Sequence, residues 1–225
     1  MKVVNIAIDG PAGAGKSTIA KAASNKLGYI YIDTGALYRT VGLNALRLGV
    51  DIQNDEAVAS TLTDDLCVEL KFVDGEQRMF LNNEDVSLAI RTPEASMAAS
   101  RVSAVPAVRK YLFDLQKNLA KTNNCIMDGR DIGTVVLPDA DVKIFLTASP
   151  EARAKRRYKE LLEKGMEASY DEVLSDMIKR DYDDSHRAIA PLKQADDAVL
   201  CDTSELTLEE SVEIVIDTIE QRIVK

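Results

Sequence analysis

The first residues suited to chemistry in this 225-residue sequence form a glycine-rich segment near its start. Residues 10–17 read GPAGAGKS and match G-x-x-x-x-G-K-[ST], between the β-branched run Val3–Ile8 and an apolar repeat with helical spacing. Glycines let successive backbone N–H groups close around phosphate oxygens at the start of a helix. We expect Lys16 to reach the β- and γ-phosphates of a nucleotide, and the Ser17 hydroxyl to bind Mg²⁺.

The phosphate-binding pattern alone leaves the reaction open. A GTPase needs a guanine-reading N-K-x-D, and the nearest candidate, residues 122–125, reads TNNC and lacks both Lys and Asp. A motor or nucleic-acid translocase would be larger and would carry a basic groove, whereas this chain has a formal net charge of −9. The remaining class is transfer of a phosphoryl group to a small acceptor.

Arginines and carboxylates follow two further predicted strands, at positions where ligands gather in open parallel sheets. Thr34 and Arg39 come after the second strand and offer a hydroxyl and a guanidinium to an anion. Asp128 follows the next strand, at the position of the metal-side acid of a phosphate-loop enzyme. Arg130 and Asp131 come directly after it, and we expect them to face the acceptor.

Charged residues also recur at helical spacing in the second half of the chain. Three arginines within Arg153–Arg157 are spaced three and four apart, so they share either a solvated face or a mobile lid over the reacting phosphates. Arg180 and Arg187 are seven residues apart, and Asp184 lies between them, where it could accept from a sugar hydroxyl. The alternative interpretation is that either arginine is a structural ion-pair partner. Arg109 is likewise either a site residue or a solvated helix arginine.

The single histidine, His186, stands among charged residues, and we expect it to be exposed rather than catalytic. A phosphate acceptor attacks through an oxygen that is already an anion, so positioning and charge neutralisation carry the rate. The expected catalytic groups are therefore a lysine, arginines and a metal ion, with carboxylates reserved for binding.

The elements that position these residues alternate between apolar strands and amphipathic helices. Strand, turn, helix and strand in the first 32 residues form a βαβ unit, whose crossover makes both strands parallel. Later helix starts are marked by Ser149 before Pro150, and by capping boxes that open at Ser169 and Thr207. We expect a P-loop, three-layer α/β fold covered by helices, whose five parallel strands are residues 3–8, 29–32, 125–127, 142–146 and 198–201.

One stretch departs from this alternation. Leu66–Val73 and Arg78–Leu81 read as two strands joined through Asp74–Gly75, which is a hairpin signal. Antiparallel pairing inside a parallel chain predicts a small insertion at about residues 62–90. Because no repeat or flexible linker occurs, we expect residues 1–225 to form a single domain rather than two independent folding units.

The composition of the chain limits the classes of molecule that it is expected to bind. The chain is 46% apolar and 29% charged, as in globular proteins, and its acidic excess disfavours nucleic acid and anionic membranes. Its three cysteines are too widely spaced for a metal site and odd in number, as expected in a reducing cytoplasm. The early apolar run ends at Asp9, which is too short for an export or membrane-spanning segment. We expect a cytoplasmic protein that acts on small molecules.

Six motifs of this chain resemble, in the same order, those of bacterial cytidylate kinases, which belong to the nucleoside monophosphate kinases. They are residues 10–18, 33–39, 90–93, 128–134, 153–157 and 180–192. The DGRD at residues 128–131 separates them from adenylate and uridylate kinases, which usually carry D-G-x-P-R there. The resemblance runs from the first strand to the final helix and implies Mg²⁺-assisted transfer of the γ-phosphate of ATP to CMP or dCMP.

The resemblance also implies where the nucleotides bind. ATP would lie on Gly10, Pro11, Ala12, Gly13, Ala14, Gly15, Lys16, Ser17 and Thr18, with Mg²⁺ held by Ser17 and Asp128. CMP or dCMP would be surrounded by Thr34, Arg39, Ser100, Arg109, Arg130, Asp131, Arg180, Asp184 and Arg187. The insertion at 62–90 would belong to the acceptor-binding part, and a lid would cover about residues 150–168. Catalysis in a monomer would rest on Lys16, Arg130, Arg153 and Arg157.

The acceptor-binding set divides by chemistry. The side chains that can fork onto the phosphate are Arg39, Arg130 and Arg180. A carboxylate accepts from the exocyclic amine that uracil lacks, so the cytosine edge suits Ser100, Arg109 and Asp131. The ribose suits Asp184 and Arg187.

Two rival functions stay open at this point. One is another small-molecule kinase of the same fold that acts on a hydroxyl or a different nucleotide, and the other is a regulatory protein that binds ATP or GTP as a ligand. An assay over CMP, dCMP, UMP, AMP and shikimate tests the first. Tight nucleotide binding with no ADP formed on addition of CMP would indicate the second.

Overall fold

The computed structural model describes residues 2–223, and contacts within the chain divide it into two compact units. The first unit comprises Met1–Tyr31 and Thr122–Lys225, and the second is the continuous stretch Ile32–Lys121. The insertion predicted at 62–90 lies inside the second unit, which begins well before it and ends well after it. The single folding domain stays a prediction.

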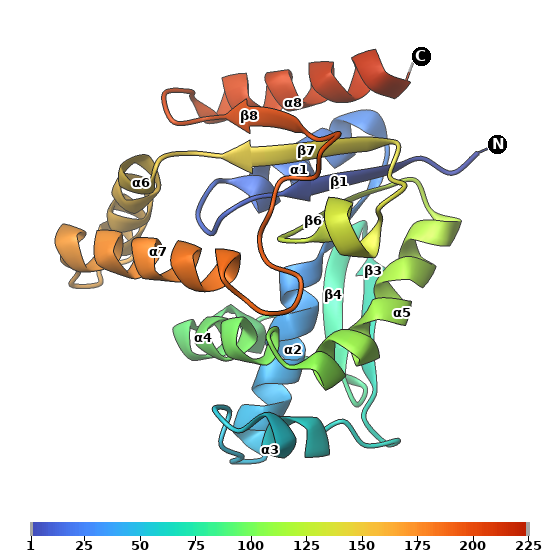
Figure 1. The fold of residues 1–225 in the computed structure, drawn as a ribbon, viewed down its shortest axis with the longest axis vertical. Helices are drawn as coiled ribbons and strands as arrows, with labels where there is room; N and C mark the ends of the chain where they lie inside the picture. The colour runs from blue at the N-terminus through green and yellow to red at the C-terminus, as the bar shows by residue number, and fades with distance from the viewer. Residues whose placement is uncertain (1, 224–225) are drawn as a thin grey trace. The chain divides into compact units, whose positions relative to one another are not determined.

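A five-stranded parallel sheet with the order β2-β6-β1-β7-β8 forms the centre of the first unit (Figure 1). Its strands are β1 Asn5–Asp9, β2 Ile30–Asp33, β6 Cys125–Gly129, β7 Val142–Thr147 and β8 Val199–Asp202. In the central strand, Ile6 pairs with Ile126 of β6 and Val142 of β7. The five predicted strands are confirmed, and their parallel direction brings their carboxyl ends to one edge.

Helices follow the strands of this unit, and two of them supply much of its core. The helical elements are α1 Lys16–Leu27, η2 Ile132–Val136, α6 Pro150–Glu163, α7 Tyr170–Ser185 and α8 Leu208–Ile223. Buried side chains of α1 and α8 pack with the sheet in one cluster that includes Ile6, Ile8, Ile19, Ala23, Ile144, Leu146, Val215 and Ile219. Each large side chain buried in this way stabilises the fold by about 1.5–3 kcal/mol. The same cluster fixes the strand ends on which the motifs stand.

The second unit combines helices with a separate sheet. Its elements are α2 Thr34–Arg47, α3 Asp55–Ser60, β3 Val68–Val73, β4 Glu76–Leu81, β5 Glu84–Asp85, η1 Ala89–Arg91, α4 Pro93–Val102 and α5 Pro106–Thr122. Helix α2 packs closely on α4. The short distance is seen at Gly42, where an added Cβ atom would lie only 3.0 Å from the Ala98 Cβ. Small residues at this crossing therefore let the two helices approach.

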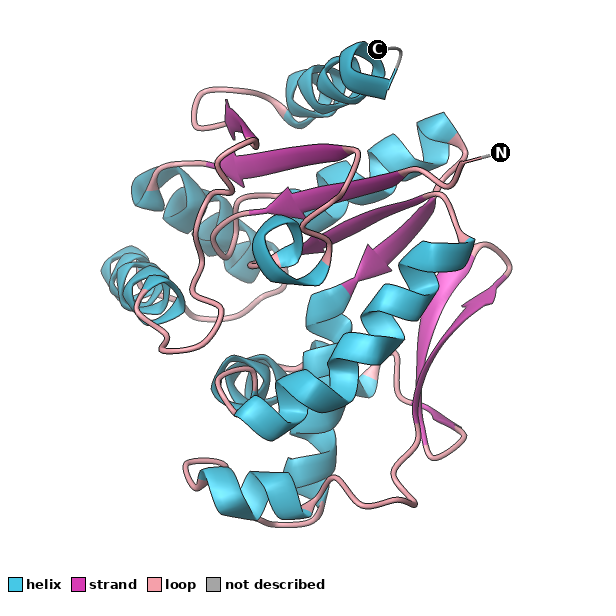
Figure 2. Ribbon diagram, turned by 45° about the vertical axis from the view of Figure 1, so that its right-hand side comes forward, coloured by secondary structure: helices cyan, strands magenta, loops and turns pink. Residues whose placement is uncertain are grey.

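The predicted hairpin is confirmed as the antiparallel pair β3–β4 (Figure 2). Its turn residues Asp74 and Gly75 have φ angles of 53° and 77°, as a two-residue hairpin turn of the I′ type requires. A third strand, β5, was not predicted; it pairs with β4 after a second left-handed turn at Asn82 and Asn83. Its two residues are exposed and too few to show an alternating pattern, so the sequence gives no strand signal there.

Two of the three predicted helix caps form as expected. The Ser149 side chain accepts from the Ala152 N–H, and the Thr207 hydroxyl accepts from the Glu210 N–H while the Glu210 carboxylate accepts from the Thr207 N–H. The capping box at Ser169 is wrong, because Ser169 takes the N-cap position of α7 without a capping bond from its side chain. In α7 the acidic first turn, which includes Glu172, interacts favourably with the helix dipole.

Membrane-spanning helices are not found in the part of the chain that the structure describes. No helix between residues 2 and 223 combines the length and apolar character needed to cross a bilayer.

The difference between these caps predicts a difference in stability. Thr207→Ala removes a reciprocal capping box and should lower the free energy of unfolding by about 1 kcal/mol in urea titrations. Ser169→Ala is the matched control, since this serine holds the same helix position without the bond, and its effect should be clearly smaller. Equal losses from both variants would contradict the assignment.

Candidate active site

The phosphate-binding loop connects β1 to α1 within the first unit. Gly10 has a φ angle of 152°, and a Cβ there would lie 1.9 Å from the carbonyl oxygen of Leu146, so only glycine fits. Gly15 is the N-cap of α1 in the left-handed conformation, and no side chain caps this helix end. The first-turn N–H groups of α1 are therefore suited to an anion.

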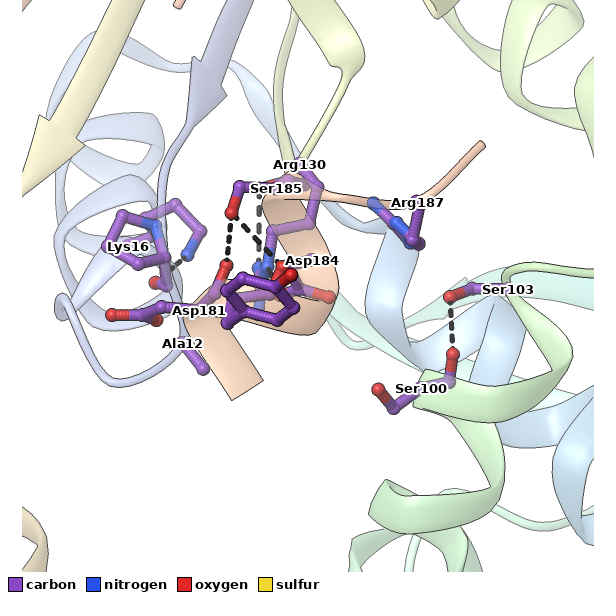
Figure 3. Close-up of polar contacts among 12 residues, drawn as sticks. Ala12, Lys16, Ser100, Ser103, Arg130, Asp181, Asp184, Ser185 and Arg187 are labelled. Atoms are coloured by element: carbon purple, nitrogen blue, oxygen red, sulfur yellow. Dashed lines mark hydrogen bonds and ion pairs between the residues drawn. The ribbon is translucent and has the colours of Figure 1, made fainter. Parts of the chain in front are cut away.

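Lys16 is the buried cation of this loop. Its side chain is 5% exposed, and its Nζ donates to the Pro11 carbonyl at 2.7 Å (Figure 3). Burial, followed by the positive charge of Arg130, holds the pKa of Lys16 well below its ordinary value, against the attraction of Asp128, Asp9 and Asp184. A phosphate group at this position would supply the anion that a charged Lys16 requires.

The side chains of Ser17 and Asp128 meet near the carboxyl ends of β1 and β6. The Ser17 hydroxyl donates to Oδ2 of Asp128 at 2.9 Å, and the Tyr31 hydroxyl donates to Oδ1 of the same carboxylate at 3.1 Å. Groups of three acidic, histidine or cysteine ligands are not found among residues 2–223. One carboxylate beside one hydroxyl fits Mg²⁺, which usually takes its other ligands from water and substrate phosphates.

Asp184 is surrounded by the arginines of the predicted acceptor set that belong to the first unit. Its carboxylate accepts from Nε of Arg130 at 2.8 Å (Figure 3). Burial raises the pKa of Asp184, but Arg130, Arg187 and Arg180 outweigh burial and lower it overall. Asp131 is also buried, next to this group in sequence. This part of the unit therefore concentrates positive charge at the edge of the sheet.

The three lid arginines have three different environments. Arg153 is 2% exposed; its Nε donates to Ala148 O and its Nη1 to Ala12 O, both at 2.8 Å, and its guanidinium pairs with the Asp181 carboxylate. Arg156 donates to the Thr203 carbonyl. Arg157 pairs with Glu160 on the helix surface at 2.8 Å. Of the three, Arg153 alone donates to a residue of the phosphate loop.

The second unit holds the remaining predicted acceptor residues. Arg39 donates through Nη2 to Asp33 at 2.7 Å, and its Nε is buried with no hydrogen-bond partner among residues 2–223. Arg109 donates to Ser103 O at 3.3 Å and lies 5.8 Å from the centre of the Tyr38 ring.

Two more predicted acceptor residues belong to the same unit. The Ser100 carbonyl accepts from the Ser103 hydroxyl at 2.8 Å (Figure 3). Thr34 is buried as the first residue of α2.

The structure thus sorts the predicted residues by unit. The first unit contains Gly10–Thr18, Asp128, Arg130, Asp131, Arg153, Arg157, Arg180, Asp184 and Arg187. The second unit contains Thr34, Arg39, Ser100 and Arg109.

The sequence did not predict a role for three residues that contact the predicted site residues or the segment directly after them. Tyr31 donates to Asp128, Asp181 pairs with Arg153, and Asp9 accepts from two backbone N–H groups beyond Asp131. Asp181 lies inside the motif at residues 180–192 and Asp9 directly precedes the one at residues 10–18, but no spacing rule connects either to its partner in another element.

Comparison with known proteins gives a family match over nearly the whole chain. The model of the cytidylate kinase family matches residues 6–221. A cytidylate kinase of Caldicellulosiruptor saccharolyticus is 51% identical over 217 residues, covering 96% of each chain, and one of Ligilactobacillus salivarius is 50% identical over 224 residues, covering 99% of each. An uncharacterised protein from Eubacterium ventriosum has a solved structure with a TM-score of 0.52 at 12% identity, covering 97% of this chain and 99% of its own, so it supports the fold.

The lowered pKa of Asp184 predicts a pH-dependent contribution to stability. A carboxylate whose native pKa is lowered stabilises fully above the ordinary Asp pKa, near 4, and loses this contribution as pH falls through the native value. Asp184→Asn in the nucleotide-free protein should therefore lower the free energy of unfolding by about 2 kcal/mol at pH 7. The difference from the wild type should shrink below about pH 4 in denaturant titrations.

Glu84→Gln is the control, since its ion pair with Arg47 is exposed. It should have a much smaller effect at pH 7. A loss at Asp184 that did not change with pH would contradict the electrostatic assignment.

Proposed function

The chain belongs to the cytidylate kinase family, whose members carry out ATP-dependent phosphoryl transfer to CMP or dCMP, and we propose how its residues divide this work. The observation that carries the proposal is the arrangement in the first unit, where a buried lysine and a set of arginines lie around the carboxyl ends of parallel strands. The phosphate loop would hold the donor, and the arginines would hold the acceptor and neutralise the transferring group.

The donor ATP would lie on residues 10–18. Backbone N–H groups at the start of α1 would donate to the phosphate oxygens, and Lys16 would exchange its bond to Pro11 O for one to the β- or γ-phosphate. The lowered pKa of Lys16 supports this role, because its Nζ is hydrogen-bonded to a neutral carbonyl and an incoming phosphate would stabilise its charged form.

The fit of Ser17 and Asp128 supports a Mg²⁺ site. Both oxygens are already within hydrogen-bond distance of each other, and Tyr31 orients the carboxylate from its other side. When bound, the ion would supply charge neutralisation across the β- and γ-phosphates.

The proposed ligands of the acceptor are divided by the chemistry of their side chains. The proposed phosphate ligands are Arg39, Arg130 and Arg180; the unpartnered buried Nε of Arg39 supports its place in this set. The proposed ligands of the cytosine edge are Ser100, Arg109 and Asp131. The proposed ligands of the ribose are Asp184 and Arg187. Thr34 would hold the anionic phosphate of the acceptor together with Arg39.

The chemical step needs positioning more than acid–base chemistry. An anionic oxygen of the CMP phosphate would attack the γ-phosphorus of ATP in line, while the bond from that phosphorus to the β–γ bridging oxygen breaks and ADP leaves. Arg130, Lys16 and the lid residues Arg153 and Arg157 would neutralise the charge on the transferring group. Arg153 already contacts the phosphate loop through Ala12 O, which supports its catalytic place.

We also propose the form of the substrate, the cell compartment and the oligomeric state of the enzyme. The acidic net charge supports action on free nucleotides rather than on nucleic acid or a membrane surface. The three cysteines are free, which supports a reducing cytoplasm. We propose that the enzyme acts there as a monomer.

Lys16→Ala should lower kcat by about 10²–10³-fold, because one preorganised cation next to the transferring phosphoryl group is lost. CMP affinity, measured by calorimetry without ATP, should change less than about threefold, because Lys16 is assigned to the donor phosphates. Lys26→Ala, an exposed lysine near the end of the same helix, is the control and should keep normal turnover. A Lys16→Ala enzyme with near-normal kcat would rule out the proposed role.

Acceptor selectivity tests both the function and the role of Asp131. The wild type should prefer CMP and dCMP over UMP and AMP in a coupled assay for ADP, and a preference for another acceptor would contradict the function. Asp131→Asn should reduce the ratio of kcat/KM for CMP to that for UMP by about tenfold, since the acceptor for the cytosine amine is weakened. Asp183→Asn, an exposed carboxylate on α7, should leave the ratio unchanged; a ratio equally unchanged in Asp131→Asn would remove Asp131 from base recognition.

A further inference from the structure

Asp9 is a buried carboxylate for which the mechanism above has no use. It is the last residue of β1, directly before Gly10 of the phosphate loop, and it is 4% exposed. Its Oδ1 accepts the N–H of Ile132 and its Oδ2 accepts the N–H of Gly133, both at 2.7 Å. These N–H groups open the single turn η2, immediately after Arg130 and Asp131.

The cations near Asp9 are committed to other partners. Lys16 donates to Pro11 O, and Lys143 of β7 donates to both oxygens of Asp197. The hydrogen bonds that Asp9 accepts therefore come from the backbone of the turn rather than from an ion pair. Burial of a carboxylate costs free energy, and the two charge-assisted hydrogen bonds from the turn offset part of that cost while they hold the turn in place.

The packing around Gly133 shows how closely the turn approaches this carboxylate. A Cβ atom at Gly133 would lie 3.3 Å from Oδ2 of Asp9 and 3.2 Å from Cδ of Lys143. Glycine thus allows the backbone to fit between the two side chains. The turn itself has π-type geometry, with the Leu137 N–H donating to Ile132 O at 2.7 Å, and such turns are frequent at functional sites.

We propose that Asp9 is a positioning residue for the acceptor: by holding the N–H groups of Ile132 and Gly133, it fixes the segment that carries Arg130 and Asp131 next to the phosphate loop. This inference rests on the proposed assignment of Arg130 and Asp131 to CMP. It links the strand that leads into the donor loop with the segment that binds the acceptor, through one side chain.

The protonation state of Asp9 adds a property that can be measured. The pKa of Asp9 is raised to about 6, because burial, together with the charge of Asp131, outweighs the hydrogen bonds from Gly133 and Ile132 and the charge of Lys16, all of which lower it. The charged groups that face Asp9 are Lys16 at the start of α1 and Asp131 beyond β6, while Lys143 of β7 packs its chain against the same turn. Protonation of one oxygen would weaken its ability to accept from the turn.

The first test is Asp9→Asn, which keeps the shape but places an NH₂ group against a backbone N–H. With the turn loosened, kcat/KM for CMP should fall about 10–100-fold, mostly through KM for CMP. ATP affinity measured without acceptor should weaken by less than about threefold, because the phosphate loop keeps its own contacts. A CMP KM like that of the wild type, or equal losses for ATP and CMP, would overturn the inference.

Asp141→Asn is the matched control. Like Asp9, Asp141 accepts a hydrogen bond from a backbone N–H. Its donor is Asn5, at 2.9 Å, which lies at the opposite end of β1 from Asp9. Its loss should leave KM for CMP unchanged, which separates the proposed role from general damage to the sheet. Gly133→Ala disturbs the same contact from the other side, so its effect and that of Asp9→Asn should be less than additive in the double variant. Additive effects would count against a shared role.

A measurement on the wild type keeps the inference testable if the variants fail to fold. In ¹H–¹⁵N spectra of the nucleotide-free protein, the amide signals of Ile132 and Gly133 should titrate with a midpoint at about 6. The signals of Arg130 and Asp131 should move with the same midpoint if Asp9 positions them. A shift confined to Ile132 and Gly133 would reduce Asp9 to a structural role.

The two proposals fail in different ways. If the wild type does not phosphorylate CMP, the proposed function is wrong. If the wild type does so and Asp9→Asn keeps its KM for CMP, only the positioning role is wrong.

Discussion

The buried side chain of Lys16 is the feature on which the phosphate-loop end of the first unit depends. Lys16 is enclosed at the start of α1, and burial together with Arg130 lowers its pKa despite three nearby carboxylates. Its Nζ is held by the Pro11 carbonyl, a neutral acceptor. The left-handed glycines of the loop keep Cβ atoms away from its backbone N–H groups, which supports the proposal that a phosphate binds here.

Four buried or half-buried carboxylates hold the cations and loops of this unit in place. Asp128 meets Ser17, Asp184 meets Arg130, Asp181 meets Arg153, and Asp9 holds the turn beyond Arg130. Each contact joins two segments that are far apart in the sequence. Because parallel strands end at one edge, residues far apart in the chain become neighbours there, and phosphoryl transfer depends on just such fixed positions. The family match and the geometry therefore support the same chemistry independently.

Local patterns in the sequence were sufficient for most of the fold. The five strands, the phosphate loop and the β3–β4 hairpin follow from apolar runs, glycine spacing and an Asp-Gly turn, all of which act within a few residues. The two-residue strand β5 and the missing cap bond of Ser169 depend on context that such patterns do not contain. The role of Asp9 could not be predicted for a different reason. Its partner Ile132 is 123 positions away in the chain, so only the folded sheet brings the two residues together. The three arginines of 153–157 share a spacing but not an environment, because their partners come from different segments.

The most direct test is a crystal structure with a non-hydrolysable ATP analogue bound. The account predicts that Nζ of Lys16 leaves the Pro11 carbonyl and lies within hydrogen-bond distance of a β- or γ-phosphate oxygen, with the N–H groups at the start of α1 around the phosphates. An analogue bound elsewhere, with the Lys16–Pro11 bond intact, would contradict it.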